Sequence, residues 1–185
     1  MNTLPKFSTP ETDADAEFAH PNVFQREDEE GWSRLTIGAR EGEVGMMLEL
    51  AKELKGPFVV LYVLVGSRAD NEHGRYQSPG PLKLDKVEAF MTCFEDFIEQ
   101  DGRHHVWIIS TMGDGQLIFD NHNMIFAYGN LERYESILKS WGFEEGKVDI
   151  PAAHTHHLHE EFDSVETELM ESWKWKRMPL APGDE

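Results

Sequence analysis

Four histidines and two glutamates lie within HTHHLHEE, residues 154–161 of a 185-residue chain that has nine histidines in all. Neutral imidazole nitrogens combined with carboxylates suit Zn, Ni or Cu, whereas Ca and Mg prefer shells made only of oxygen atoms. The candidate metal ligands of this segment are His154, His156, His157, His159, Glu160 and Asp163. We therefore expect the segment to bind a divalent transition metal such as Zn or Ni.

The spacing of these residues suggests how ligands could be paired. On a helix, residues four apart share one face, so His156 with Glu160 would supply two ligands. A metal site needs more than one such pair, and a candidate source is the turn that holds Asp120 and His122. The segment has neither the His-Glu-x-x-His order nor a Cys-x-x-Cys pair, so the alternative is a solvated connection whose histidines hydrogen-bond carboxylates.

The turn FDNHNM, residues 119–124, has two interpretations of its own. Asp120 and His122 could act together as an acid–base pair. However, Asn and Asp are also the residues that a tight turn requires, because they tolerate unusual backbone angles. The second interpretation is favoured. The chain has no Gly-x-Ser-x-Gly motif, and its single cysteine has no histidine beside it, so no nucleophile is predicted.

A further polar group lies in GSRADNEHGRYQSPGPL, residues 66–82, which follows the most apolar run of the chain. The candidate ligand-binding residues of this loop are Arg68, Glu72, His73, Arg75 and Tyr76. The two arginines could hold a carboxylate or a phosphate, and the histidine could transfer a proton. The alternative is a mobile loop without a binding function.

The elements that must position these residues follow from apolar periodicity. The pattern predicts strands at 32–39, 58–66 and 104–111, a hairpin at 116–129, and helices at 43–56, 84–102 and 131–143. Strands and helices do not alternate strictly, so a doubly wound parallel sheet is not favoured. We expect an α+β core domain over residues 31–143, with a mixed or mainly antiparallel sheet of about five strands and helices packed on one face.

The two ends of the chain are expected to differ from this core. Residues 1–30 are polar and acidic, which is typical of a flexible arm. Residues 144–185 combine the histidine-rich connection with an amphipathic helix whose apolar stripe contains Phe162, Val165, Leu169 and Trp173. Lys174, Lys176 and Arg177 would complement the dipole at the C-terminal end of that helix. The helix is expected to dock on the core of its own chain or on a second copy of the chain. In the second case the two copies would form a homodimer.

The net charge of −18 limits the choice of partners. A negative field repels phosphate backbones and anionic lipid, so neither nucleic acid nor membrane is an expected partner. The charge is compatible with a basic protein partner and equally with acidity that serves solubility alone. The single cysteine, Cys93, cannot form an internal disulfide, and residues 1–18 do not resemble a secretory signal, so we expect a cytoplasmic protein.

Two hypotheses for function follow from these observations. The first is a binding or regulatory module for a basic protein partner. The second is a divalent-metal-dependent, hydrolase-like enzyme that uses the histidines at 154–159. The two differ in whether His73, His122 and the 154–159 histidines meet in one pocket.

Overall fold

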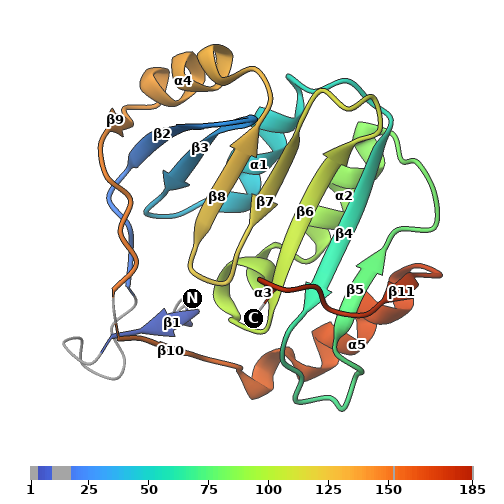
Figure 1. Ribbon diagram of the computed structural model, residues 1–185. Helices are drawn as coiled ribbons and strands as arrows, with labels where there is room; N and C mark the ends of the chain where they lie inside the picture. Colours follow the sequence, from blue (N-terminus) through green and yellow to red (C-terminus); the bar gives the residue numbers. More distant parts are fainter. Residues whose placement is uncertain (1–3, 10–17, 152, 185) are drawn as a thin grey trace.

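A single large sheet organises the molecule, whose computed structural model describes residues 4–9, 18–151 and 153–184 (Figure 1). Within these residues the sheet has nine strands in the order β11-β5-β4-β6-β7-β8-β3-β2-β9. Its strands are β2 (Val23–Glu29), β3 (Trp32–Gly38), β4 (Phe58–Leu64), β5 (Gly74–Gln77), β6 (His104–Ser110), β7 (Gln116–Phe119), β8 (Met124–Tyr128), β9 (Glu144–Glu145) and β11 (Lys176–Met178). All neighbours pair antiparallel except β2 and β9, which pair parallel, so the sheet is mixed.

The α+β class is confirmed, but the expected size of the sheet is wrong. The five predicted strands are β3, β4, β6, β7 and β8, and they form most of the middle of the sheet. The additional strands extend it on both sides. They were not apparent because each offers few apolar side chains: in VFQREDE of β2, only Phe24 is fully buried.

Five α-helices accompany the sheet in the described residues: α1 (Glu43–Ala51), α2 (Leu84–Cys93), α3 (Glu95–Gln100), α4 (Leu131–Ser140) and α5 (Asp163–Ser172). Helices α1, α2 and α3 cover one face, and α4 lies at the end of the sheet near β2 (Figure 1). The helix predicted at 84–102 is interrupted at Phe94, and Cys93, just before this interruption, is exposed. No helix among the described residues is both long enough and apolar enough to cross a bilayer.

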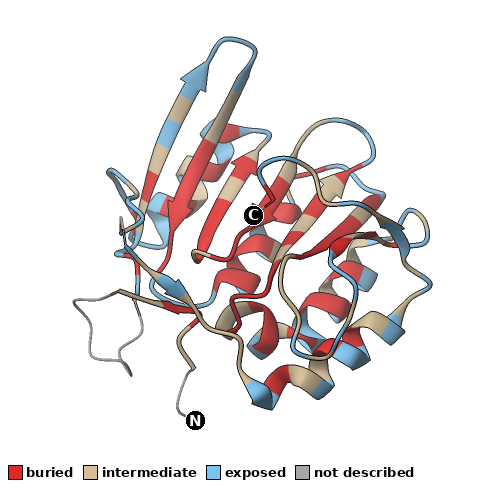
Figure 2. Ribbon diagram, turned by 60° about the horizontal axis from the view of Figure 1, so that its bottom comes forward, coloured by how far each residue is buried: buried red, intermediate tan, exposed pale blue. Residues whose placement is uncertain are grey.

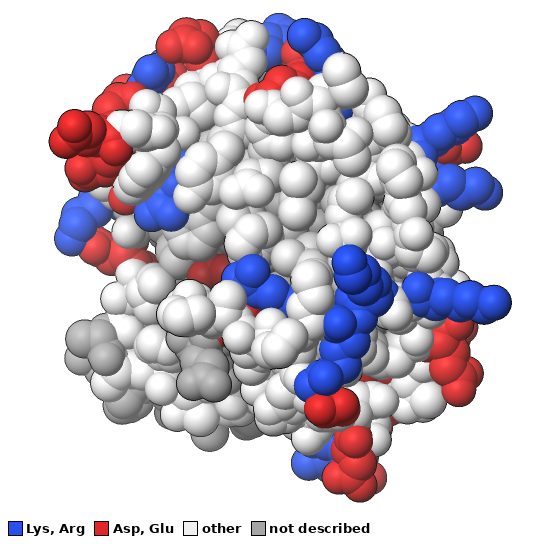
Figure 3. Space-filling model, turned by 45° about the vertical axis from the view of Figure 1, so that its right-hand side comes forward, with Lys and Arg blue, Asp and Glu red and all other residues white. Residues whose placement is uncertain are grey.

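The core lies between the sheet and these helices, where the buried residues gather (Figure 2). Strand β6 shows the alternation that produces it, with Val106 and Ile108 fully buried on the helix side and Trp107 between them on the other side. The opposite face carries a row in which Trp107, Ile118 and Phe126 are cross-strand neighbours. In Figure 3 the upper middle of the molecular surface is largely uncharged, while Lys and Arg side chains lie across the lower middle and most other charged side chains lie toward the margin.

The prediction of a flexible arm at 1–30 is wrong for the parts that the structure describes, because they pair with other strands. Val23–Glu29 pairs along its whole length with β3. Nearer the N-terminus, Lys6 and Phe7 are buried, and β1 (Phe7–Ser8) pairs antiparallel with β10 (Thr155–His156) in a separate two-stranded sheet. The apolar rings of Phe7 and Phe24 explain this attachment, and residues 1–3 and 10–17 lie outside the described residues.

The C-terminal region also belongs to the fold. A short 3-10 helix, η1 (Glu160–Phe162), leads into α5, and the two dock on the core of their own chain through the buried side chains of Phe162 in η1 and Leu169 in α5. Helix α5 ends at Ser172, earlier than expected. The basic residues predicted at the end of this helix lie beyond it instead, and two of them are in β11.

Candidate metal centre

Three histidines from two distant segments meet at one edge of the sheet. His122 lies in the turn between β7 and β8. His154 lies just before β10, and His156 lies in β10. One nitrogen of each ring lies within 4.8 Å of one nitrogen of each other ring. Among the described residues, these three histidines therefore form a group that could hold a metal ion. Extended backbone places residues two apart on the same side of a strand, which explains why His154 and His156 act together.

The three imidazole rings form a nearly regular triangle. The ring centroids are 4.9 Å apart for His122 and His154, 4.8 Å for His122 and His156, and 5.0 Å for His154 and His156. The ring of Phe7 lies 6.0, 5.8 and 6.0 Å from His122, His154 and His156, and its side chain is 1% exposed. The N-terminal strand therefore supplies an apolar support for all three rings.

Hydrogen bonds fix the orientation of two of these rings. His122 Nδ1 lies 2.9 Å from Asp120 Oδ2, and His154 Nδ1 lies 3.0 Å from the carbonyl oxygen of Pro151. Carboxylate and carbonyl oxygens only accept, so Nδ1 carries the proton in both rings. When neutral, both rings consequently present the lone pair of Nε2.

These two Nε2 atoms face each other at 3.1 Å. Two lone pairs at this distance repel each other unless a proton or a metal ion lies between them. In a tetrahedral zinc site with Zn–N bonds of about 2.0–2.1 Å, two ligand nitrogens are about 3.3 Å apart. The separation of His122 and His154 is thus close to that of two ligands of one ion.

The third ring, His156, is neutral and has a free nitrogen. Its Nδ1 is buried and has no hydrogen-bond partner among the described residues. The pKa of His156 is lowered to about 4, first by burial and then by the nearby rings of His122 and His154. A buried polar atom without a partner needs an explanation, and a bound ion is one of the few available.

Asp120 supports the centre from behind His122. Its Oδ1 accepts hydrogen bonds from the backbone N–H groups of His122 and Met124, both at 2.9 Å, while Oδ2 holds the imidazole. Burial alone would raise the pKa of Asp120. The hydrogen bond from His122 and the electrostatic interaction with its ring outweigh burial and lower this pKa below the ordinary value. The side chain therefore forms the turn, as predicted, and also orients a ring in the way that carboxylates behind metal-bound histidines do.

A pocket of about 440 Å³ opens beside the three rings. Its other lining residues are Val65, Gly66, Gly102, Arg103, Asn121 and Leu158. The Arg103 side chain is fully buried and donates to Asp101, Asp163 and Glu166, so its charge is balanced within the protein. Three ligands beside an open pocket are the arrangement of catalytic zinc sites, whereas structural zinc sites are closed by four ligands.

The remaining residues predicted from HTHHLHEE do not join this group. His157 Nε2 lies 2.8 Å from Ser8 Oγ, and His159 Nε2 donates to the carbonyl oxygen of Pro5 at 2.9 Å, so both rings hold the N-terminal segment. Glu160 lies 3.6 Å from Arg68, and Asp163 pairs with Arg103 at 3.2 Å. These carboxylates thus neutralise arginines. The helical pairing expected between His156 and Glu160 is wrong because the backbone is extended at His156 and a helix begins only at Glu160.

The candidate ligand-binding loop at 66–82 does not form one site either. Arg68 lies 3.3 Å from Asp163, and Arg75 makes two hydrogen bonds to Asp184 at 2.8 and 2.7 Å. Each arginine is therefore paired with a carboxylate of the C-terminal region and is not available to clamp a ligand.

The other members of this loop have local partners. Glu72 pairs with Arg177 at 2.6 Å and accepts a hydrogen bond from the Tyr76 hydroxyl at its backbone carbonyl. The side chain of His73 is exposed, and His73 does not belong to the three-histidine group. Of the histidines whose meeting in one pocket would separate the two hypotheses, His122, His154 and His156 lie together and line the pocket.

Sequence reasoning missed the contribution of the N-terminal segment. Phe7 and the buried Lys6 lie about 150 residues from His156 in the chain, and no short-range pattern connects them. Lys6 Nζ donates to the carbonyl oxygens of Ile98 at 3.0 Å and Asp120 at 2.9 Å, which ties this segment to the turn that carries His122. The chain matches no known protein-family model, and no curated protein or solved structure is significantly similar to it.

Proposed function

We propose that His122, His154 and His156 bind one divalent transition ion, Zn or Ni, and that this ion is the centre of a hydrolase-like enzyme. The observation that carries the proposal is the contact between His122 Nε2 and His154 Nε2 at 3.1 Å, with the Nδ1 proton of each ring committed to an acceptor. A bound divalent cation would relieve the repulsion between these lone pairs and would give the buried Nδ1 of His156 the partner that it lacks among the described residues.

The chemistry of such a centre supports hydrolysis. Zinc held by three histidines lowers the pKa of a bound water from about 15.7 to about 7, which generates a hydroxide nucleophile near neutral pH. The adjoining pocket of about 440 Å³ is large enough for a small substrate. Val65 and Leu158 would exclude bulk water, and the amide of Asn121 could orient a polar group of the substrate.

Metal content is the first test. Chelator-treated protein is supplied with Zn, and bound metal is measured by elemental analysis after desalting. We expect one ion per chain in the parent and loss of bound ion in His122→Ala, His154→Ala and His156→Ala. The matched control is His73→Ala, which removes an exposed histidine outside the group and should leave the stoichiometry unchanged.

Catalysis is tested on the same proteins. The metal-loaded parent should hydrolyse an activated ester such as p-nitrophenyl acetate, with a rate that rises through an apparent pKa near ~7, and His156→Ala should be inactive. Stoichiometric metal without hydrolysis of esters, phosphate esters or amides would refute the enzyme while leaving the metal centre. Metal binding that is weak, substoichiometric and equal in all variants would refute both.

A binding or regulatory role for a basic protein partner stays a prediction, as does the cytoplasmic location. The net charge of −18 still favours a cationic partner, and such binding should weaken as salt rises. The proposed homodimer through α5 has less support, because Phe162 and Leu169 of its apolar stripe are already buried in the core of the same chain.

A further inference from the structure

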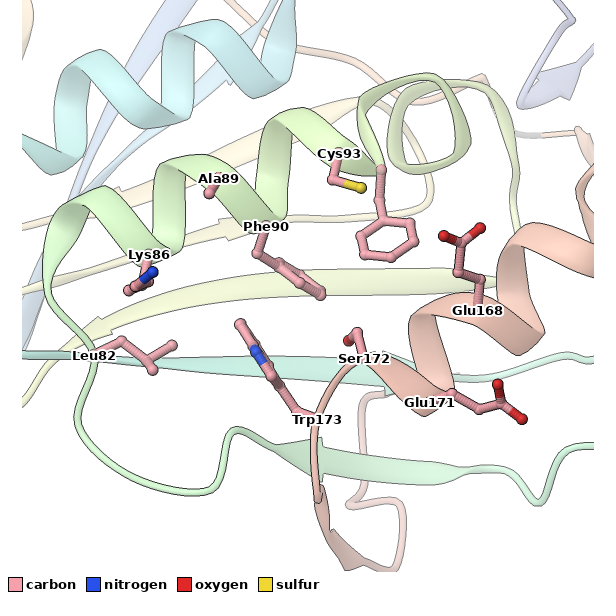
Figure 4. Close-up of a pocket in the computed structure, with 10 residues that line it drawn as sticks. Leu82, Lys86, Ala89, Phe90, Cys93, Glu168, Glu171, Ser172 and Trp173 are labelled. Atoms are coloured by element: carbon pink, nitrogen blue, oxygen red, sulfur yellow. The ribbon is translucent and has the colours of Figure 1, made fainter.

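A second pocket lies in the groove between α2 and α5, away from the histidines (Figure 4). Its volume is about 480 Å³. The residues that form its apolar floor are Leu82, Ala89, Phe90, Phe94 and Trp173, and its remaining lining residues are Lys86, Cys93, Glu168, Glu171 and Ser172. The volume falls within the range of about 300–1,000 Å³ that is usual for small-molecule sites.

The floor of this groove is aromatic and rigid. Phe90 and Trp173 stack with ring centroids 4.3 Å apart and an interplanar angle of 22°, and Phe94 lies 5.2 Å from Phe90. Phe90 and Phe94 are each 5% exposed, so they are held by the core behind them. Aromatic side chains of this kind bind the apolar parts of ligands.

One end of the groove is strongly negative. Glu168 and Glu171 are exposed, and no ion pair joins either carboxylate to another described residue. Both lie close to the end of α5 at Ser172, and its last turn contains no basic residue. The backbone carbonyls at a helix C-terminus carry a partial negative charge, which cations normally complement. Two carboxylates here are therefore unfavourable for the helix in isolation.

The other end of the groove has the opposite charge. Lys86 lies at the far end of the lining from Glu168 and Glu171, with Phe90 and Trp173 between them (Figure 4). A ligand that fits this arrangement has an apolar body over the aromatic floor and its positive group at the α5 end. A second copy of α5 does not fit, because its own acidic residues would meet Glu168 and Glu171.

We propose that the groove between α2 and α5 binds an organic cation with an aromatic or alkyl body, whose positive group lies against Glu168 and Glu171. The site is separate from the metal centre and does not depend on it. The ligand would supply the positive charge that the last turn of α5 lacks, and it would cover the part of the Phe90–Trp173 stack that lines the groove.

Cys93 allows a specific test because it is the only cysteine, is exposed, and lines the groove. Its labelling by the neutral reagent methyl methanethiosulfonate is followed by mass spectrometry in the presence of benzyltrimethylammonium, benzyl alcohol or phenylacetate. We expect the cation to slow labelling most and the anion least. The indole N–H resonance of Trp173, followed by NMR, provides a second readout that does not depend on the cysteine.

Charge variants then test the role of the two carboxylates. The double variant Glu168→Gln/Glu171→Gln should bind benzyltrimethylammonium about three- to ten-fold more weakly, as expected for the loss of two exposed ion pairs. The matched control Glu41→Gln/Glu144→Gln changes the net charge equally at exposed positions outside the groove and should bind as the parent does. The proposal is overturned if the three probes protect Cys93 equally, if the groove variant binds like the control, or if millimolar cation changes neither readout.

Discussion

The substitution Asp120→Asn separates the support of the metal centre from its ligands. Asp120 Oδ1 accepts two backbone N–H groups of the turn, and an asparagine oxygen can accept the same two hydrogen bonds. The amide nitrogen would then take the position of Oδ2, 2.9 Å from His122 Nδ1. Because this nitrogen only donates, His122 would have to move its proton from Nδ1 to Nε2, and the lone pair that faces His154 would be lost.

The expected magnitude follows from this change of tautomer. Loss of a carboxylate behind a metal-bound histidine typically weakens metal affinity about 10- to 100-fold, which corresponds to about 1.4–2.7 kcal/mol. We expect the upper half of this range because Asp120 is only 5% exposed, so water cannot readily replace its Oδ2. The metal-free protein should remain folded, since both turn hydrogen bonds are retained.

Competition for Zn between the metal-free protein and a chromophoric chelator measures the affinity, and the ¹⁵N shifts of the His122 ring report its tautomer. The matched control is Asp114→Asn, the same chemical change in the turn between β6 and β7, where Asp114 accepts from the backbone N–H of Lys55 at 3.0 Å. The reasoning fails if Asp120→Asn binds Zn as tightly as Asp114→Asn does and His122 keeps its Nδ1 proton.

Two further predictions concern the N-terminal strand. Burial lowers the pKa of Lys6 from 10.5 to about 8, so the folded state loses this proton first and stability should rise as pH increases from 8 to 10.5. Relative to Lys6→Met, the chelator-treated parent should gain about 3 kcal/mol across this window in denaturant unfolding, and a pH-independent difference would contradict the burial of the charge. Phe7→Ala should cost about 3–5 kcal/mol of unfolding free energy and weaken Zn binding, whereas Phe7→Leu should retain most of both. An unchanged thermal midpoint in Phe7→Ala would show that the strand is not packed against the histidines.

The central part of the fold could be predicted because its strands carry their own evidence. FVVLYVLV and HHVWII alternate or run apolar for long enough to identify β4 and β6 without any knowledge of their neighbours. The edge strands could not be predicted in this way. Strand β2 is held in the sheet by its pairing with β3, which includes an ion pair between Glu27 and Arg34 at 2.6 Å. The apolar pattern within β2 itself does not contain these partners and so does not predict the strand.

The three-histidine group was predicted in part for a similar reason. The density of imidazoles identified the segment, and the need for more ligands pointed to the turn at His122. The geometry was wrong because a helical spacing was assumed, in which residues four apart share a face. Whether residues 154–159 are helical or extended depends on β1, whose residues lie at the other end of the chain.

The extended backbone also explains why the segment holds so many histidines. Its alternation turns His154 and His156 toward His122, and it turns His157 and His159 toward Ser8 and Pro5 of the N-terminal segment. The backbone is fixed on both sides as well, since His157 N–H donates to the carbonyl oxygen of Lys6 and its own carbonyl accepts from Gly102 N–H, each at 2.9 Å. One pair of histidines thus belongs to the candidate metal site, while the other pair holds the strand that supports it. Metal binding should therefore stabilise the docking of the N-terminal strand, and loss of that strand should weaken metal binding by the same factor, because the two equilibria are linked.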